Sequence, residues 1–309
     1  MSAKSGIVIL GIFAADTAYK AKRLPHIGET LLGSGFTLGP GGKGSNQAIA
    51  AAKAGGKVSF ISRVGNDPFG EMALAAYAAA GVEARVMKMD GVSSGAAFIF
   101  VDEVSGDNAI IVAPGAAGLI GIEDIDANRA EIESAAIFMT QLEQPLEAAI
   151  HGLSMAKRAG VTTIFNPAPA QAIPDSVYGF CDFIVPNEVE AAQLVGHAIE
   201  TDEQARAAAK TLVDRGARAV IITLGARGAF YHAAGQSELV PALSAGNVVD
   251  TTGAGDAFLG GFATATSEGR TPIEAIRFGC ATAAIAVTRP GTAPAMPSRS
   301  EIDALLRSQ

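Results

Sequence analysis

The sequence predicts an α/β fold in which a mostly parallel sheet is covered by helices on both faces. Three observations support this prediction. Short apolar runs alternate with longer alanine-rich stretches, the order that a parallel sheet with crossover helices requires. The chain has 309 residues, of which 49% are hydrophobic and 17% charged, so it can bury a large core. Glycine follows several of the alanine-rich stretches, as expected where helices end.

The expected elements follow one another regularly. Strands are predicted at the short apolar runs Ile7–Leu10, Val58–Ser62, Ala136–Met139, Val161–Phe165, Phe183–Val185 and Ala219–Thr223. Helices are predicted between them at Ser45–Ala54, Phe69–Ala80, Leu146–Ala159, Asn187–Val195 and Glu203–Arg215. Glycines at the expected helix ends are Gly55, Gly81, Gly160 and Gly216. We expect a single domain over residues 1–309, because no repeat or long linker interrupts this order.

Two regions, residues 13–38 and 84–112, depart from the alternation. They contain strand-like pieces, such as Gly95–Val101 and Asn108–Val112, without an intervening helix. We expect these pieces to form a small antiparallel sheet that projects from the main domain. A projecting sheet above a binding site is typical of a lid.

Composition excludes several classes of function. The net charge of −8 disfavours nucleic acid as a partner, because phosphate backbones select basic surfaces. The two cysteines, Cys181 and Cys280, are too few for a disulfide framework or a cysteine metal site. No apolar run is long enough for a signal peptide or a membrane span. We therefore expect a cytoplasmic protein that binds neither nucleic acid nor a membrane.

A short motif near the C-terminus indicates chemistry. Residues Asp250–Asp256 read DTTGAGD and precede the apolar run Ala257–Phe262. The glycines allow a tight turn into a buried helix, so backbone N–H groups and the positive end of the helix dipole would converge on an anion. Asp256 would place a carboxylate there, able to deprotonate a hydroxyl that attacks a phosphoryl group. The alternative is an ordinary helix start capped by Thr252.

A second glycine cluster, Gly39–Asn46, reads GPGGKGSN. It matches the G-x-G-x-x-G pattern of dinucleotide-binding loops, but the preceding strand lies too far upstream for that fingerprint, which argues against an NAD-dependent dehydrogenase. A Walker A loop is excluded because Lys43 is followed by glycine rather than serine or threonine. What remains is a glycine-rich helix start whose Lys43 and Asn46 bind hydroxyls, or simply a turn with a solvated lysine.

With Asn187-x-x-Glu190 between them, these two motifs resemble those of the ribokinase (PfkB) family of sugar kinases. The likeness extends along nearly the whole chain, through Pro25–Thr30, Gly39–Ala52, Gln141–Pro145, Asn166–Ala170, Pro186–Glu190, Ile221–Gly228 and Ala275–Gly291. It implies a ribokinase-like fold with a β-sheet lid, and ATP-dependent phosphorylation of a primary hydroxyl of a small sugar, with D-ribose as the first candidate. The alternatives are a kinase for another pentose, a ketohexose or a nucleoside, or a non-catalytic sugar-binding protein on the same fold.

The resemblance also implies which residues bind the substrates. The sugar would be bound by Ala14, Asp16, Gly42, Lys43, Asn46, Glu143 and Asp256. ATP would be bound by Asn187, Thr223, Gly225, Arg227, Gly228 and Gly255. Asp256 would be the catalytic base, and the anion hole would consist of Gly253, Ala254 and Gly255.

Two metal ions are implied in the same way. Glu190 would help to hold Mg²⁺ through water, although Asn187-x-x-Glu190 fits a capping box equally well. A K⁺ ion would be held by Asp250, Thr252, Ala286, Arg289 and Gly291. Ala295 stands where the family commonly has a serine ligand, which weakens the expectation of K⁺ activation.

Other departures concern the sugar and the oligomer. Ala14 and Ala117 stand where ribokinases tend to have asparagine, so two polar groups are absent from the expected pocket, and ribose is in doubt. Phe98 of the lid is expected to fill part of that space. In ribokinases two lids pack together, so we expect a homodimer through the lid segments.

Overall fold

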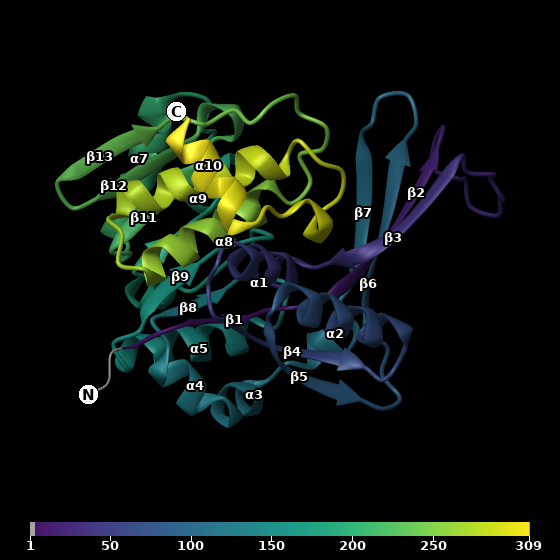
Figure 1. Ribbon diagram of the computed structural model, residues 1–309, viewed down its shortest axis with the longest axis horizontal. Helices are drawn as coiled ribbons and strands as arrows, with labels where there is room; N and C mark the ends of the chain where they lie inside the picture. The colour runs from purple at the N-terminus through teal and green to yellow at the C-terminus, as the bar shows by residue number, and fades with distance from the viewer. Residues whose placement is uncertain (1–3, 309) are drawn as a thin grey trace.

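The computed structural model describes residues 4–308, which form a large sheet between two helical layers and a separate small sheet (Figure 1). In this part of the chain the large sheet has nine strands in the order β13-β12-β11-β10-β9-β8-β1-β4-β5. Neighbours from β5 to β11 pair in parallel, and β11, β12 and β13 are antiparallel, so the predicted mostly parallel sheet is confirmed. The strands are β1 Ile7–Leu10, β4 Val58–Gly65, β5 Glu83–Met89, β8 Ile137–Thr140, β9 Thr162–Phe165, β10 Phe183–Ile184, β11 Ala219–Thr223, β12 Ala229–Ala233 and β13 Gln236–Val240.

Helices cover both faces of this sheet. They are α1 Lys43–Lys53, α2 Pro68–Ala80, α3 Ile122–Ala127, α4 Arg129–Ser134, α5 Leu146–Arg158, α6 Glu188–Val195, α7 Asp202–Asp214, α8 Ala254–Ser267, α9 Pro272–Ala286 and α10 Arg299–Arg307. Alternate residues of β1 enter the two cores: Ile7 and Ile9 pack with α1, α8 and α9, while Val8 and Leu10 pack with α3, α5 and α7. Among the described residues, no helix combines the length and the apolar character needed to cross a membrane.

The four glycines expected at helix ends have positive φ angles: Gly55 101°, Gly81 78°, Gly160 69° and Gly216 121°. Residues with a side chain rarely adopt this left-handed conformation, so each glycine can end the preceding helix without strain.

The small sheet is the predicted lid, and it stands apart from the main body in Figure 1. Its strands run in the order β3-β2-β6-β7 and are β2 Ala14–Ala21, β3 Gly35–Gly41, β6 Gly95–Asp102 and β7 Asn108–Ala113. The expected antiparallel pairing is confirmed for β2 with β3 and for β6 with β7, whereas β2 and β6 run in parallel.

The predicted lid segments also need correction at their ends. Residues 84–89 belong to β5, the edge strand of the large sheet, and the lid extends to Gly41 and Ala113 instead. Most side chains of β5 are exposed, so it lacks the apolar run that marks the buried strands.

Glycines allow α8 to approach its neighbours closely. A Cβ atom at Gly260 would lie 2.5 Å from Cβ of Ala50 in α1, and one at Gly261 would lie 2.3 Å from Oγ1 of Thr282 in α9. A larger residue at either position would force the helices apart. The N-terminal ends of α1 and α8, which carry the two glycine motifs, also meet, and Asn46 and Asp256 are hydrogen-bonded there.

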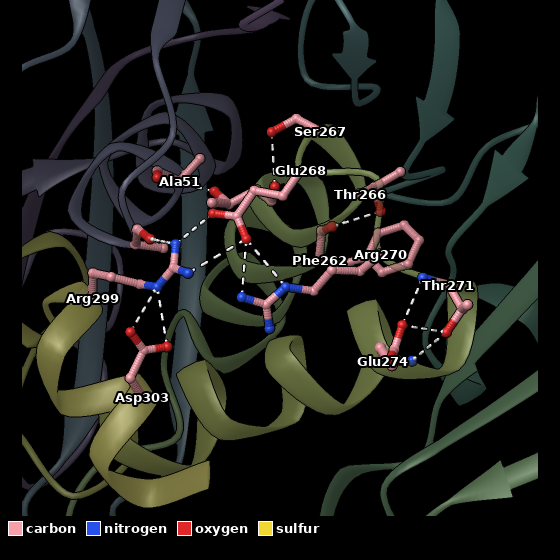
Figure 2. Close-up of polar contacts among 12 residues, drawn as sticks. Ala51, Phe262, Thr266, Ser267, Glu268, Arg270, Thr271, Glu274, Arg299 and Asp303 are labelled. Atoms are coloured by element: carbon pink, nitrogen blue, oxygen red, sulfur yellow. Dashed lines mark hydrogen bonds and ion pairs between the residues drawn. The ribbon is translucent and has the colours of Figure 1, made fainter. Parts of the chain in front are cut away.

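The C-terminal helix α10 contacts both α9 and the end of α8. Figure 2 shows the Arg299 guanidinium between Glu268, which follows α8, and Asp303 of α10. Arg299 and Arg270 also lie over the ring of Phe278, 5.2 Å and 4.7 Å from its centroid. The ion pairs are about one-third exposed and individually weak, and α10 also buries Ile302 and packs Leu305 and Leu306 against the core.

Candidate active site

The turn before α8 provides the predicted anion site. Gly253 has a φ of 75°, which only glycine adopts readily, and α8 begins at the next residue. The N–H of Ala254 donates to the carbonyl of Thr251 at 3.2 Å. The amides of Gly255 and Asp256 follow in the first helical turn, where N–H groups have no intrahelical acceptor. An anion at this helix end would therefore meet N–H donors and the positive end of the helix dipole.

Asp256 connects the two glycine motifs. Its side chain is buried, and its carboxylate accepts hydrogen bonds from Nδ2 of Asn46 at 3.2 Å and from Nε2 of Gln47 at 3.0 Å. Both donors lie on α1. The predicted base on α8 is thus fixed against the helix that starts at the first glycine motif.

The other residues predicted for the sugar lie around Asp256. The backbone N–H of Lys43 donates to Oε2 of Glu143 at 2.8 Å, which places Glu143 at the start of α1. Asp16, on β2 of the lid, lies against Gly41 of β3, where an added Cβ would come within 2.2 Å of its carboxyl group. Position 41 must therefore be glycine for Asp16 to keep this place.

Two acceptors at this site are open to a ligand. Within residues 4–308 no hydrogen bond reaches the Asp16 carboxylate from the protein, and the buried Oδ1 of Asn46 lacks a donor as well. Buried acceptors normally have a donor. Hydroxyl groups of a bound sugar fit both positions, which supports the predicted use of these two residues.

Carboxylates crowd around the ammonium group of Lys43. Burial raises the pKa of Glu143 to about 7, and burial followed by the charge of Asp256 raises the pKa of Asp16 to about 6. Burial also raises the pKa of Asp256, against the opposing effect of Lys43. Burial alone would lower the pKa of Lys43, but the charges of Asp256, Glu143 and Glu190 outweigh it and raise that pKa, so the lysine stays protonated.

The predicted nucleotide side is a cavity of about 160 Å³ next to the anion site. From the predicted residues it is lined by Lys43, Asn187, Glu190, Thr223, Gly253, Ala254, Gly255 and Asp256. Asn187 and Glu190 form the capping box that was the alternative interpretation: Glu190 N–H donates to Oδ1 of Asn187, and Asn187 N–H donates to Oε2 of Glu190, both at 2.8 Å. Glu190 nevertheless faces the cavity, so capping and ligand binding are compatible here.

Arg227 is not among the residues that line this cavity. Its guanidinium forms ion pairs with Glu188 at 2.8 Å and Asp202 at 3.0 Å. Gly225 and Gly228 lie in the same turn between β11 and β12, outside the residues that line the cavity. The use of these three residues for ATP stays a prediction.

Comparison with known proteins decides the family. Residues 4–299 match the model described as pfkB family carbohydrate kinase. The chain belongs to this family. It is 38% identical to the ribokinase of Haemophilus influenzae over 96% of each chain, and 37% identical to the deoxyribokinase of Salmonella typhi over 97% of this chain and 98% of that protein. The structure of Arabidopsis thaliana ribokinase complexed with ribose and ATP is similar, with a TM-score of 0.91 at 30% identity over 98% of this chain and 99% of that one.

Membership of the PfkB family confirms the predicted ribokinase-like fold and the prediction of an ATP-dependent sugar kinase. A non-catalytic protein on the same fold is not supported by these relatives. The glycine motifs and Asp256 that indicated phosphoryl transfer lie close together in the fold.

The segments predicted to hold K⁺ also meet in this PfkB kinase. Asp250 accepts hydrogen bonds from the N–H groups of Thr252 and Gly291, each at 2.9 Å, and so joins the loop before α8 to the loop after α9. Arg289 lies in the second loop, where its side chain pairs with Glu301 of α10. The use of these residues for K⁺ stays a prediction.

One expectation about the lid is wrong. Phe98 pairs with Thr17, one position from the Asp16–Ala97 pair, and therefore lies on the face of the lid opposite Asp16. It cannot fill the space beside Ala14. Ala14 itself is buried, and so is Ala117, so the places of both missing asparagines lie inside the protein.

Sequence reasoning missed three buried amides close to Asp256. Gln47, Gln141 and Asn166 lie within the segments that carry the resemblance, but no role was expected for them. One signal was available: Gln47 begins a nearly uninterrupted alanine-rich run on α1, where a polar side chain needs a partner.

Proposed function

We propose that this PfkB kinase transfers the γ-phosphoryl group of ATP to the primary hydroxyl of D-ribose, giving ribose 5-phosphate. One observation carries the proposal: Asp256 lies between the hydroxyl-binding groups of α1 and the cavity at the N-terminal end of α8. A base at that junction can reach a hydroxyl on one side and a phosphoryl group on the other. The ribokinases among its relatives, including the complex with ribose and ATP, support this substrate pair.

In the proposed reaction Asp256 accepts the proton of the sugar hydroxyl while the oxygen of that hydroxyl bonds to the γ-phosphorus. The bond from that phosphorus to the bridging oxygen breaks, and ADP leaves. The amides at the start of α8, predicted as Gly253, Ala254 and Gly255, stabilise charge on the transferring group, with those of Gly255 and Asp256 the better placed. Lid closure would exclude water that could otherwise consume ATP.

Two ions belong to the proposal. Glu190 faces the cavity and would hold Mg²⁺ through water, and the ion would neutralise phosphate charge. Asp250, Thr252, Ala286, Arg289 and Gly291 would hold K⁺ beside the anion site. Ala295 supplies no hydroxyl, so backbone carbonyls would carry most of that coordination.

The pH dependence of sugar affinity follows from the raised pKa values. Glu143 and Asp16 accept hydroxyl hydrogen bonds best when ionised, and their pKa values are about 7 and about 6. As the pH falls through these values the carboxylates become protonated, so KM for the sugar should rise on the acid side. Measuring KM for the sugar by steady-state kinetics between roughly pH 5 and pH 9 checks the result. A KM that is constant down to pH 5 would contradict the assignment of both groups.

2-Deoxy-D-ribose is the second candidate substrate. Ala14 and Ala117 are buried alanines where the family tends to have asparagine, and a sugar with one hydroxyl fewer leaves fewer groups without partners. Deoxyribokinases are among the relatives at 37% identity. The acceptor pocket, rather than the phosphoryl-transfer chemistry, separates the two candidates.

Restoring an asparagine at position 14 should sharpen selectivity. If D-ribose is the substrate, Ala14→Asn adds one hydrogen bond to an uncharged hydroxyl, and kcat/KM for ribose should rise a few-fold to about tenfold. Ala14→Val, which adds bulk without polarity, is the matched control. Should ribose turnover fall instead while another sugar is used well by the native protein, the pocket is shaped for that other sugar.

An ATP-consumption assay with purified protein tests the function directly. D-ribose, 2-deoxy-D-ribose, D-fructose and adenosine are compared at equal concentration, with Mg²⁺ and with K⁺ or Na⁺. The largest kcat/KM identifies the acceptor. Activity with none of them would overturn the proposal for ribose, and strong preference for adenosine or fructose would replace it with one of the other family activities.

We further propose that two copies associate through the lid. The face of the lid away from Asp16 carries the exposed apolar side chains Tyr19, Phe36, Leu38, Phe98 and Ile111. A patch of this kind on a projecting sheet marks an interaction surface. Light scattering at micromolar concentration should give the mass of a dimer, and Ile111→Glu should give a monomer. A native protein that is strictly monomeric under these conditions contradicts the proposal.

We also propose a cytoplasmic location. ATP is its phosphoryl donor, and both cysteines, Cys181 and Cys280, are free and buried, as expected in a reducing compartment.

A further inference from the structure

Three buried amide side chains form a chain of hydrogen bonds that ends on Asp256. Nδ2 of Asn166 donates to the carbonyl of Val185 at 2.8 Å, and its Oδ1 accepts from Nε2 of Gln47 at 3.3 Å. The same Nε2 donates to Oδ1 of Asp256 at 3.0 Å. Nε2 of Gln141 donates to Oε1 of Gln47 at 2.5 Å. Gln47 is therefore held by two other amides while it contacts the base.

The network leaves Gln47 one possible orientation. The carbonyl of Val185 can only accept, so Asn166 must present its donor end there and its oxygen to Gln47. Asn166 therefore requires the amide nitrogen of Gln47 on its side, where Asp256 also lies, and the oxygen of Gln47 then accepts from Nε2 of Gln141. A reversed Gln47 amide would place its oxygen against the oxygens of Asn166 and Asp256, and its nitrogen against the donor nitrogen of Gln141. The donor to Asp256 is thus determined by groups that do not contact Asp256.

The position of these amides in the fold makes the network rigid. Gln141 follows β8 and Asn166 follows β9, so both lie at the carboxyl ends of parallel strands beneath the start of α1. The side-chain oxygen of Gln141 occupies the space that a Cβ at Gly11 or Gly44 would need, at 2.5 Å and 2.8 Å. Gln47 and Gln141 are fully buried. Close backbone contact therefore prevents the outer glutamine from rotating away.

We propose that Gln47, oriented by Gln141 and Asn166, is the positioning residue that fixes the Asp256 carboxylate and keeps it ionised for attack by the sugar hydroxyl. The inference rests on the proposed role of Asp256 as the base. Gln47 does not belong to the predicted sugar or nucleotide sites, and nothing assigned above requires a glutamine there.

The charges around Asp256 explain why its carboxylate needs hydrogen-bond donors in fixed positions. Burial raises the pKa of Asp256, and the charges of Lys43 and then the hydrogen bonds from Gln47 and Asn46 act in the opposite direction. The carboxylates of Asp16, Glu143 and Glu190 face the same region and add repulsion. With Gln47 on Oδ1 and Asn46 on Oδ2, each carboxylate oxygen meets an N–H donor, which cannot accept a proton from the acid form. The remaining lone pairs are left for the substrate hydroxyl.

Three variants test the proposal with the intact enzyme: Gln47→Met, Gln141→Met and Gln144→Met. Gln144 is the matched control, because it is a buried glutamine that donates to Oγ1 of Thr140 and to the carbonyl of Gln141, both at 2.7 Å, without contacting Asp256. The measurements are kcat and KM for the sugar over a range of pH, sugar affinity by calorimetry, and Tm.

Gln47→Met should lower kcat at neutral pH by about tenfold to a hundredfold, the effect of losing a hydrogen bond to a charged group. Sugar affinity should change by no more than about twofold, because Gln47 contacts Asp256 and is not among the residues expected to bind the sugar. The acid limb of the kcat profile should move to higher pH, since a carboxylate with fewer donors holds its proton more tightly. Gln141→Met should act in the same direction with a smaller effect, and Gln144→Met should leave the profile in place.

Two results would overturn the inference. One is a folded Gln47→Met enzyme with native kcat and native pH profile. The other is an equal loss of kcat in the Gln47 and Gln144 variants without a shift in pH profile, which would indicate packing alone. If Gln47→Met does not fold, Gln141→Met decides by the same two readouts.

A double-variant comparison separates this inference from the proposed function. In an Asp256→Asn background, Gln47→Met should cause no further loss of kcat, because its target is gone. If Asp256→Asn itself stays active, the assignment of the base has failed. If Asp256→Asn is inactive while Gln47→Met alone leaves kcat and its pH profile unchanged, only the positioning role has failed.

Discussion

Asp256→Asn should lower kcat by roughly 10²-fold or more, the size of a lost general base, while folding and sugar binding stay nearly intact. Asparagine has the same shape as aspartate, and its oxygen can still accept from Gln47 on α1. The variant loses the negative charge and the capacity to take the hydroxyl proton, and its amide nitrogen replaces the oxygen that accepts from Asn46. Initial rates at saturating ATP and sugar measure the loss, and calorimetry with sugar alone verifies that the site is preserved. A variant that keeps more than half of the native kcat would show that another group is the base.

Asp16→Ala should have the second largest effect, a fall in kcat/KM for the sugar of roughly 10²- to 10³-fold. Its carboxylate is placed by Gly41 and has no hydrogen-bond donor from the described protein, so its accepting capacity is free for vicinal sugar hydroxyls. Two hydrogen bonds to a charged acceptor, each worth about 1.5–3 kcal/mol, account for an effect of at least this size.

Asp107→Ala is the matched control for this prediction, because Asp107 is an exposed carboxylate in the turn between β6 and β7 of the same lid. It should leave kcat/KM unchanged. An Asp16→Ala enzyme with native KM for its sugar would mean that β2 does not reach the substrate.

The parallel part of the fold could be predicted because its strands are short apolar runs. β1 and β11 have the predicted bounds, and the other buried strands differ by a few residues at their ends. β12 and β13 were not predicted as strands, since they form an antiparallel hairpin whose side chains are only partly buried on β13. β5 was assigned to the lid for a similar reason: an edge strand needs no continuous apolar run.

Part of the candidate site lies in motifs that are local in the sequence. Asp256, Lys43 and Asn46 each belong to a glycine-rich segment that suggested an anion site or a hydroxyl site beside simpler alternatives, and the resemblance to the family then indicated them together with Asp16 and Glu143. Gln47 and Gln141 are far apart in the chain and lie in no motif of known chemistry. Their role depends on the meeting of α1 with the end of β8, which is a property of tertiary packing.

The crowding of carboxylates around Lys43 also affects the stability of the folded chain. Asp16 and Glu143 have ordinary pKa values of 3.8 and 4.5, which the fold raises to about 6 and about 7. Their contribution to stability is complete below the ordinary values and is lost as the pH rises through about 6 and about 7. At neutral pH the empty site therefore weakens the fold. Hydroxyl donors and cations that bind there relieve this repulsion, so the thermal stability of the enzyme is highest when the site is occupied. The empty enzyme is thus less stable because its site is built to bind these groups.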